Sequence, residues 1–244
     1  MLQSDVATAA EGRCSACPHS RTGCAGAVIC RFAARGAQRP SLREMPRGAR
    51  RRLPPDAGRW RFVAVREGLV AASADTGDGR RQILCLTGPD ELVCPAMPGG
   101  PAHSLEALAP ARICEIDLSA DAPRLARDPD YWRTLYQLAG EGLSRAASCI
   151  VGLGRLDGPS RLAAFLSEMC ERMGRAGEGG GRSLSLPMTR EDIADHLGLS
   201  PETVSRLFTR LRREGLVAFR TPTVMEIPDP AALRRAAGLA PAGA

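Results

Sequence analysis

The chain has 244 residues and a formal net charge of +6, and arginine supplies the basic side chains because lysine does not occur. This length is enough for one or two domains that each bury a core. The sequence contains neither a run of about eighteen apolar residues nor a basic start followed by an apolar stretch. It therefore predicts no membrane span and no secretory signal, and it favours a protein that acts in the cytoplasm.

Four of the nine cysteines lie in a short N-terminal segment. Cys14, Cys17 and Cys24 have the spacing C-x2-C-x6-C, and Cys30 follows them. Two residues between cysteines allow both sulfurs to bind one metal centre, so an iron-sulfur cluster and zinc are both open. A covalent haem is not expected, because Pro18 stands where that motif needs histidine. Four further cysteines lie among apolar neighbours, and we expect them to pack as small hydrophobic side chains: Cys85, Cys94, Cys149 and Cys170.

A compact β domain is predicted next. Residues 59–66 alternate apolar and polar side chains, Glu67–Gly68 forms a turn, and strands follow at 69–73 and 81–86 around a second turn at 76–79. The preceding part, 41–58, is short and basic, so we expect a trimmed first hairpin there. Its arginines are typical of a solvated face.

A long helix is predicted from Asp130 to Leu156. Apolar or small residues recur there close to a three-four repeat, which would let the helix pair with a second copy. They are residues 131, 135, 138, 139, 142, 146, 149, 150 and 153. Its four glycines each weaken the helix by up to about 1 kcal/mol relative to alanine. They fit a marginal dimer or tight helix packing equally well.

The C-terminal third reads as a second folded part. Gly158–Pro159 marks a break, residues 161–172 predict an amphipathic helix, and the glycine-rich stretch 174–181 predicts a flexible surface loop. Residues 216–227 alternate into two strands of a small wing. The alanine-rich end from Asp229 is expected to be weakly helical and then frayed.

Between that helix and the wing, two short helices are predicted around a glycine turn. Thr189 is a candidate N-cap with Asp192 three residues later, and Gly198 can supply the left-handed turn. Ser200 is a second N-cap with Pro201 at the first helical position of a helix that runs to about Arg213. This is the pattern of a helix-turn-helix.

The second helix has an apolar and a polar side. Its predicted buried stripe is Val204, Leu207, Phe208 and Leu211. Arginine and glutamate on the other side can bind guanine, cytosine and phosphate in a major groove. The alternative is a solvated charged face on a helical hairpin. The candidate DNA-binding residues are Thr189, Arg190, Ser200, Glu202, Thr203, Ser205, Arg206, Thr209 and Arg210.

The string from Glu202 to Arg206 resembles the recognition helix of the Fnr branch of the Crp/Fnr family of transcription regulators. The resemblance implies an α+β fold with five parts: a cysteine-rich segment (1–40), a β-roll sensor domain like a cyclic-nucleotide-binding jelly roll (41–127), a dimerisation helix (128–157), a winged helix-turn-helix domain (158–230) and a tail (231–244). It also implies a homodimer that binds palindromic double-stranded DNA with TTGAT half-sites and acts on RNA polymerase. Glu202, Ser205 and Arg206 would read the bases.

The same resemblance implies a [4Fe-4S] cluster. Residues 111–119 resemble the family segment that supplies a fourth ligand, so the expected ligands are Cys14, Cys17, Cys24 and Cys114. The second gap is one residue longer than in the best-known member, which makes Cys30 the substitute for Cys24. A zinc knuckle of the four N-terminal cysteines is the structural alternative. Cyclic nucleotide is not expected, because residues 88–104 contain no arginine to neutralise a phosphate.

The sequence therefore predicts an oxygen-responsive DNA-binding dimer that uses a [4Fe-4S] cluster. Two alternatives keep the DNA-binding half: a regulator that senses nitric oxide or redox state, and a zinc-stapled constitutive dimer. An enzyme is not expected, since no nucleophile with a base, phosphate-binding loop or dinucleotide fingerprint occurs. The histidines, His19, His103 and His196, are expected at the surface.

Overall fold

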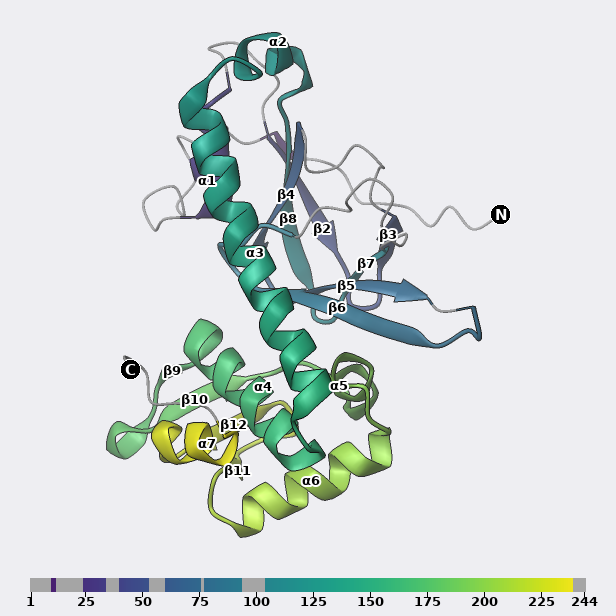
Figure 1. The fold of residues 1–244 in the computed structure, drawn as a ribbon, viewed down its shortest axis with the longest axis vertical. Coiled ribbons are helices and arrows are strands. Elements are labelled where there is room, and N and C mark those ends of the chain that lie inside the picture. The colour runs from purple at the N-terminus through teal and green to yellow at the C-terminus, as the bar shows by residue number, and fades with distance from the viewer. Residues whose placement is uncertain are drawn as a thin grey trace. The chain divides into compact units, whose positions relative to one another are not determined.

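The fold is that of a computed structural model, which describes residues 10–11, 24–33, 40–52, 60–75, 77–93 and 104–238. The chain forms two compact units, Met1–Ser144 and Arg145–Ala244. Their boundary falls inside one long helix, α3, Pro129–Arg155, which runs through the centre of Figure 1. No helix in the described ranges has the length and apolar character needed to span a membrane.

The N-terminal unit contains two antiparallel sheets of four strands (Figure 1). One has the order β1-β2-β8-β4 and the other β3-β7-β5-β6. A core cluster draws Met45, Val65 and Ile113 from the first sheet and Val70 and Leu105 from the second, so the sheets enclose it between them. The strands are β1 Ala10–Glu11, β2 Ser41–Met45, β3 Arg50–Arg52, β4 Arg61–Glu67, β5 Val70–Asp75, β6 Arg81–Thr87, β7 Ser104–Ala107 and β8 Ala111–Asp117.

The strands expected at 59–66, 69–73 and 81–86 are confirmed as β4, β5 and β6. Gly68 makes the first turn with a φ of +87°, and a Cβ there would lie 2.7 Å from Ala111 Cα, so only glycine fits. The trimmed hairpin expected before them is not a hairpin. Its two strands, β2 and β3, pair with β8 and β7 in different sheets.

A second core lies where helices cover the first sheet. Helix α1, Ala25–Cys30, packs against β4 and β8, and the 3-10 turn Ser119–Asp121 leads through α2, Ala122–Leu125, into α3. Ile29, Phe62, Cys114 and Tyr131 are buried together in this core. Burial raises the pKa of Tyr131 to about 12.

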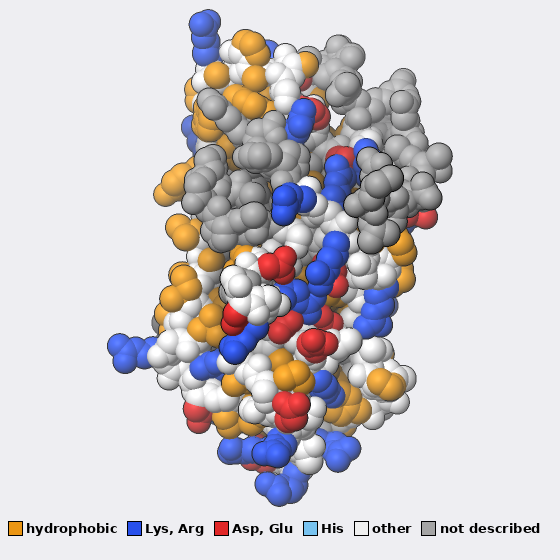
Figure 2. Space-filling view, turned by 90° about the vertical axis from the view of Figure 1, so that its right-hand side faces the viewer, with side chains coloured by type: hydrophobic (Ala, Val, Ile, Leu, Met, Phe, Trp, Pro, Cys, Tyr) orange, Lys and Arg blue, Asp and Glu red, His pale blue; other side chains and the backbone are white. Residues whose placement is uncertain are grey.

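Helix α3 has two different faces along its length. Tyr131 and Thr134 are its buried residues, and Leu135 and Leu138 pack partly against the core of the N-terminal unit. The predicted pairing stripe is therefore wrong at positions 131, 135 and 138, which face the chain's own core. Six exposed apolar residues of α3 instead follow a strict three-four repeat: Tyr136, Ala139, Leu143, Ala146, Ile150 and Leu153, called here the α3 seam. Val151, which is also exposed, lies outside this repeat. Hydrophobic side chains line the left-hand edge of Figure 2.

The C-terminal unit combines helices with a third antiparallel sheet, of order β11-β12-β10-β9 (Figure 1). Its elements are α4 Gly158–Met173, β9 Arg175–Ala176, a 3-10 turn Glu178–Gly180, β10 Arg182–Ser185, α5 Arg190–Leu197, α6 Pro201–Arg213, β11 Ala218–Phe219, β12 Val224–Ile227 and α7 Pro230–Ala236. The two wing strands are confirmed. The flexible loop expected at 174–181 is wrong, because β9 pairs with β10 there and Gly181 is buried.

Candidate nucleic-acid interface

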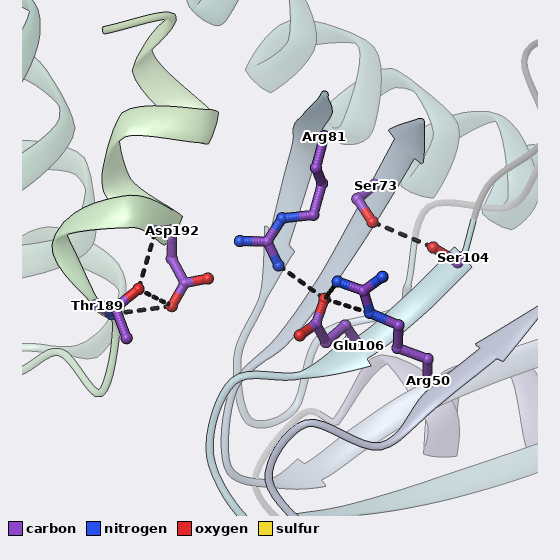
Figure 3. A network of polar contacts seen from close by, with 7 residues as sticks. All are labelled: Arg50, Ser73, Arg81, Ser104, Glu106, Thr189 and Asp192. Atoms are coloured by element: carbon purple, nitrogen blue, oxygen red, sulfur yellow. Dashed lines mark hydrogen bonds and ion pairs between the residues drawn. The ribbon is translucent and has the colours of Figure 1, made fainter. Parts of the chain in front are cut away.

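Helix α5 begins with the capping arrangement expected from the sequence. The Thr189 hydroxyl accepts a hydrogen bond from the Asp192 backbone N–H at 3.0 Å, and the Asp192 carboxylate accepts one from the Thr189 N–H at 2.9 Å (Figure 3). Together these bonds satisfy two backbone donors that the first turn of a helix leaves unpaired. Ile193, Ala194 and Leu197 form the buried side of α5.

The turn into α6 is also set by local sequence. Gly198 has a φ of +62°, the left-handed conformation that ends α5. Ser200 caps α6 by accepting a hydrogen bond from the Thr203 N–H at 3.2 Å, and Pro201 occupies the first turn. The helix-turn-helix is therefore confirmed, with α6 covering Pro201–Arg213.

One side of α6 is buried and the other is exposed. Val204, Phe208 and Leu211 are buried, while Leu207 from the predicted stripe is partly exposed. The exposed side carries the predicted polar residues Glu202, Ser205, Arg206, Thr209 and Arg210. Basic side chains gather at the lower end of Figure 2, in the unit that contains α6.

Neighbouring groups shift the pKa of two charged side chains on this side, Glu202 and Arg210. A hydrogen bond from its own backbone N–H and one from Ser200 lower the pKa of Glu202, and the Arg206 charge one turn later adds to the effect. Arg210 Nε contacts Glu214 Oε1 at 2.7 Å, which raises the pKa of Arg210. Both groups are fully exposed. Exposed ion pairs of this kind are weak because solvent screens them.

The hydroxyls of α6 are held against their own helix. Ser205 Oγ donates to the Pro201 carbonyl at 2.9 Å and Thr209 Oγ1 donates to the Ser205 carbonyl at 3.1 Å. Each hydroxyl oxygen still has lone pairs that can accept a hydrogen bond.

Two predicted side chains are more enclosed than their sequence pattern indicates. The Arg190 guanidinium stacks on the Phe208 ring at 3.7 Å from its centroid, with Phe219 at 5.4 Å, and burial lowers its pKa. His196, expected at the surface, is 9% exposed and lies 5.2 Å from the Phe165 ring. Neither stacking partner could be identified from helical spacing alone.

The basic run of the N-terminal unit is neutralised in part. Glu106 on β7 lies between Arg50 Nε at 3.1 Å and Arg81 Nη1 at 2.7 Å (Figure 3). Arg43 and Arg51 both contact Glu115 on β8. Three arginines of this run, Arg43, Arg50 and Arg51, are thus held by carboxylates of neighbouring strands, together with Arg81 of β6.

Known proteins match the region that carries this interface. Residues 160–236 match the model of the Crp-like helix-turn-helix domain. Over 170 residues the chain is 39% identical to the nitrogen fixation regulation protein FixK of Rhizobium meliloti, covering 70% of this chain and 75% of the relative. The chain belongs to the Crp/Fnr family of transcription regulators.

Two further Crp/Fnr comparisons extend over both units. The transcriptional activator protein FnrL of Cereibacter sphaeroides is 29% identical over 183 residues, covering 72% of this chain and 73% of FnrL. The solved structure of FixK2 from Bradyrhizobium japonicum has a TM-score of 0.71 and 26% identity, over 84% of this chain and 99% of FixK2. The expected β-roll, long helix and helix-turn-helix are thus the fold of this Crp/Fnr regulator, which binds DNA. Members of the family bind DNA as dimers.

The expected metal ligands are only partly visible. Cys14 and Cys17 lie outside the described residues. Cys24 precedes α1 and is 4% exposed, Cys30 ends α1, and Cys114 lies in β8 and is 7% exposed. Among described residues, no group of three or more metal-binding side chains comes together. Helix α1, which Cys24 precedes and Cys30 ends, packs on β8, which contains Cys114.

Proposed function

We propose that this regulator is a homodimer that binds TTGAT-type palindromes under low oxygen, and that it responds through a [4Fe-4S] cluster held by Cys14, Cys17, Cys24 and Cys114. The observation that carries the proposal is the packing of helix α1, called here the cysteine helix because Cys24 precedes it and Cys30 ends it, on strands β4 and β8. Strand β8 contains Cys114.

The packing around Gly26 supports Cys24 and Cys114 as partners. A Cβ on Gly26 would lie 2.8 Å from Ala64 Cβ and 3.4 Å from Cys24 Sγ, so Cys24 and Ala64 both lie beside Gly26. Ala64 and Cys114 are direct cross-strand partners in the β4–β8 pairing. Direct partners have Cβ atoms about 4.5–5.5 Å apart on the same face of a sheet. Both thiols are buried and fit the thiolate ligation that such a cluster needs.

The same geometry argues against the zinc knuckle. Cys24 and Cys30 lie at opposite ends of α1, six residues apart, which corresponds to about 9 Å along a helix. Two sulfurs on one tetrahedral zinc lie within about 4 Å of each other. Helix α1 would have to unwind before both cysteines could bind one zinc ion.

The two residues that follow helix α1, Arg31 and Phe32, contact the start of α3. Arg31 Nη2 donates to Thr134 Oγ1 at 2.9 Å, and the Phe32 and Tyr131 rings meet edge-to-face at 5.3 Å. Thr134 and Tyr131 are the buried residues of α3, so the segment directly after α1 touches α3 where α3 is anchored. When bound, the cluster would supply an oxygen-labile link between the N-terminal cysteines and β8. Losing that link would loosen α1 and, through these contacts, α3.

Pairing through α3 is the proposed route to the dimer. The α3 seam repeats every three and four residues, which is the pattern of two helices that supercoil around each other. Tyr136, Leu143 and Ile150 are 80%, 71% and 69% exposed, which is a large apolar exposure for side chains of a single helix.

In this dimer each α6 would enter the major groove of one half-site. Arg206 suits guanine O6 and N7, ionised Glu202 suits the amino group of cytosine, and Ser205 can bond to either. Thr209 and Arg210, one turn further on, would contact phosphates, as would Thr189, Arg190, Ser200 and Thr203. RNA polymerase is the expected protein partner at a promoter, and no cyclic nucleotide is required.

The test measures affinity for a duplex with two TTGAT half-sites, using protein purified without oxygen and the same protein after exposure to air. We expect tight binding that air abolishes. Cys114→Ala should bind weakly in both states, and Cys85→Ala, a change on β6 away from the proposed ligands, should behave like the wild type. Tryptophan fluorescence checks that both variants fold. Air-insensitive binding, or a folded Cys114→Ala that still responds to air, would contradict the proposal.

A further inference from the structure

A single guanidinium joins the end of α3 to the helix-turn-helix. Arg161, in the first turn of α4, donates through Nη2 to the carbonyls of Leu153 at 3.1 Å and Leu156 at 3.0 Å. Through Nη1 it donates to the carbonyl of Leu197 at 2.7 Å. The first two carbonyls belong to the last turn of α3 and its following residue, and the third is that of the last residue of α5.

The chemistry of this contact is specific to arginine. The last carbonyls of a helix have no partner within the helix, and the negative end of its dipole lies there. Arg161 places one positive charge between two such ends and bonds to both. A lysine has the charge but lacks the planar fork that reaches two groups in fixed directions.

Close packing surrounds the bonds. A Cβ on Gly198, which ends α5, would lie 3.4 Å from Leu153 Cδ2 of α3 and 3.8 Å from Arg161 Nη1. A Cβ on Gly158, which starts α4, would lie 3.4 Å from Leu207 Cδ1 of α6. The link between α3 and α4 is only Leu156 and Asp157, and the Asp157 carboxylate caps α4 by accepting from the Ser160 N–H at 2.9 Å.

We propose that Arg161 is a positioning residue that fixes the helix-turn-helix on the C-terminal end of α3 and so sets the half-site spacing that the dimer accepts. The inference rests on the proposed pairing through α3, because only then do two such joints determine how far apart the two α6 helices lie. Two recognition helices must enter the groove about one DNA turn apart, about 34–36 Å. A loosened joint lets this distance and the angle between the helices vary.

The experiment compares Arg161→Met with the wild type on two duplexes. The first is the preferred site, selected from random duplexes with the wild-type protein under anaerobic conditions, so that the TTGAT assignment is not needed. The second has one base pair added between the half-sites. The matched control is Arg182→Met, because Arg182 Nη2 also bonds to helix C-terminal carbonyls, Gly174 at 2.7 Å and Cys170 at 3.3 Å, but has no bond to α3 or α5.

One added base pair rotates a half-site by about 35° relative to the other, so we expect the wild type and Arg182→Met to lose at least about tenfold in affinity. The affinity of Arg161→Met should fall by less than about threefold from the preferred duplex to the lengthened one. On the preferred duplex, this variant should bind more weakly than the wild type. Thermal unfolding of both variants confirms that the C-terminal unit folds.

The outcomes separate the two proposals. If the wild type binds both spacings equally, pairing through α3 is wrong, and with it the role of Arg161. If the wild type discriminates and a folded Arg161→Met discriminates as strongly, the positioning role alone is overturned. In that second case, Arg161→Met would lose the same affinity relative to the wild type on both duplexes, and Arg161 would only stabilise the fold.

Discussion

Replacing Gly26 by alanine should weaken the docking of the cysteine helix on the sheet. The new Cβ would lie 2.8 Å from Ala64 Cβ, closer than such atoms approach, so α1 must move away from β4. Overpacking of this kind costs about 1–3 kcal/mol, while the better helix propensity of alanine returns at most about 1 kcal/mol. We therefore expect a net loss of about 1–2 kcal/mol in the free energy of unfolding of the N-terminal unit.

Urea unfolding followed by tryptophan fluorescence measures this change. The chain has two tryptophans: Trp60 stacks on the Tyr131 ring and Trp132 meets it edge-to-face, so both report on the N-terminal unit. With an m value of about 1–3 kcal/mol/M, the midpoint should fall by about 0.3–2 M. Gly140→Ala is the matched control, because a Cβ there meets nothing within 4 Å in the described chain and should raise the midpoint slightly. An unchanged or raised midpoint for Gly26→Ala would refute the packing argument.

Three further predictions concern the C-terminal unit. Arg206→Ala should weaken binding by roughly 1–3 kcal/mol and relax discrimination at one base position, measured by anisotropy on matched and mutated half-sites, and unchanged discrimination would remove its base-reading role. Thr189→Ala breaks the capping box and should cost about 1 kcal/mol in thermal unfolding, and an unchanged melting temperature would contradict it. Hydrogen bonds from Ser160 lower the pKa of Asp157; its contribution to stability is therefore present above its usual pKa of about 4 and is lost as pH falls below it. Asp157→Asn should flatten this acid dependence in melting curves, and identical curves would argue against it.

The parts of the fold that the sequence predicts well depend on neighbouring residues. The caps Thr189 and Ser200, the turn glycine Gly198 and the proline after Ser200 each act within one helical turn, so the helix-turn-helix follows from local chemistry. The same is true of Gly68 in the turn between β4 and β5. Such signals do not depend on the rest of the chain.

The parts that the sequence does not predict depend on distant residues. The stretch 174–181 reads as a glycine-rich loop, but β10 pairs with β12 more than forty residues later, and that pairing brings β9 into the sheet. Tyr131 fits a pairing stripe by spacing, yet α1 and the sheet cover it. Arg161 gives no signal in the sequence, because its partners are backbone carbonyls of two other helices.

The most direct test of the sensing proposal is the metal content of the protein purified without oxygen, measured as iron, sulfide and zinc together with the visible spectrum before and after exposure to air. The proposal predicts a brown protein with about four irons and four sulfides per chain that bleaches in air, with Cys114→Ala lacking the colour. A colourless protein that contains zinc and is unchanged by air would contradict the oxygen-sensing proposal.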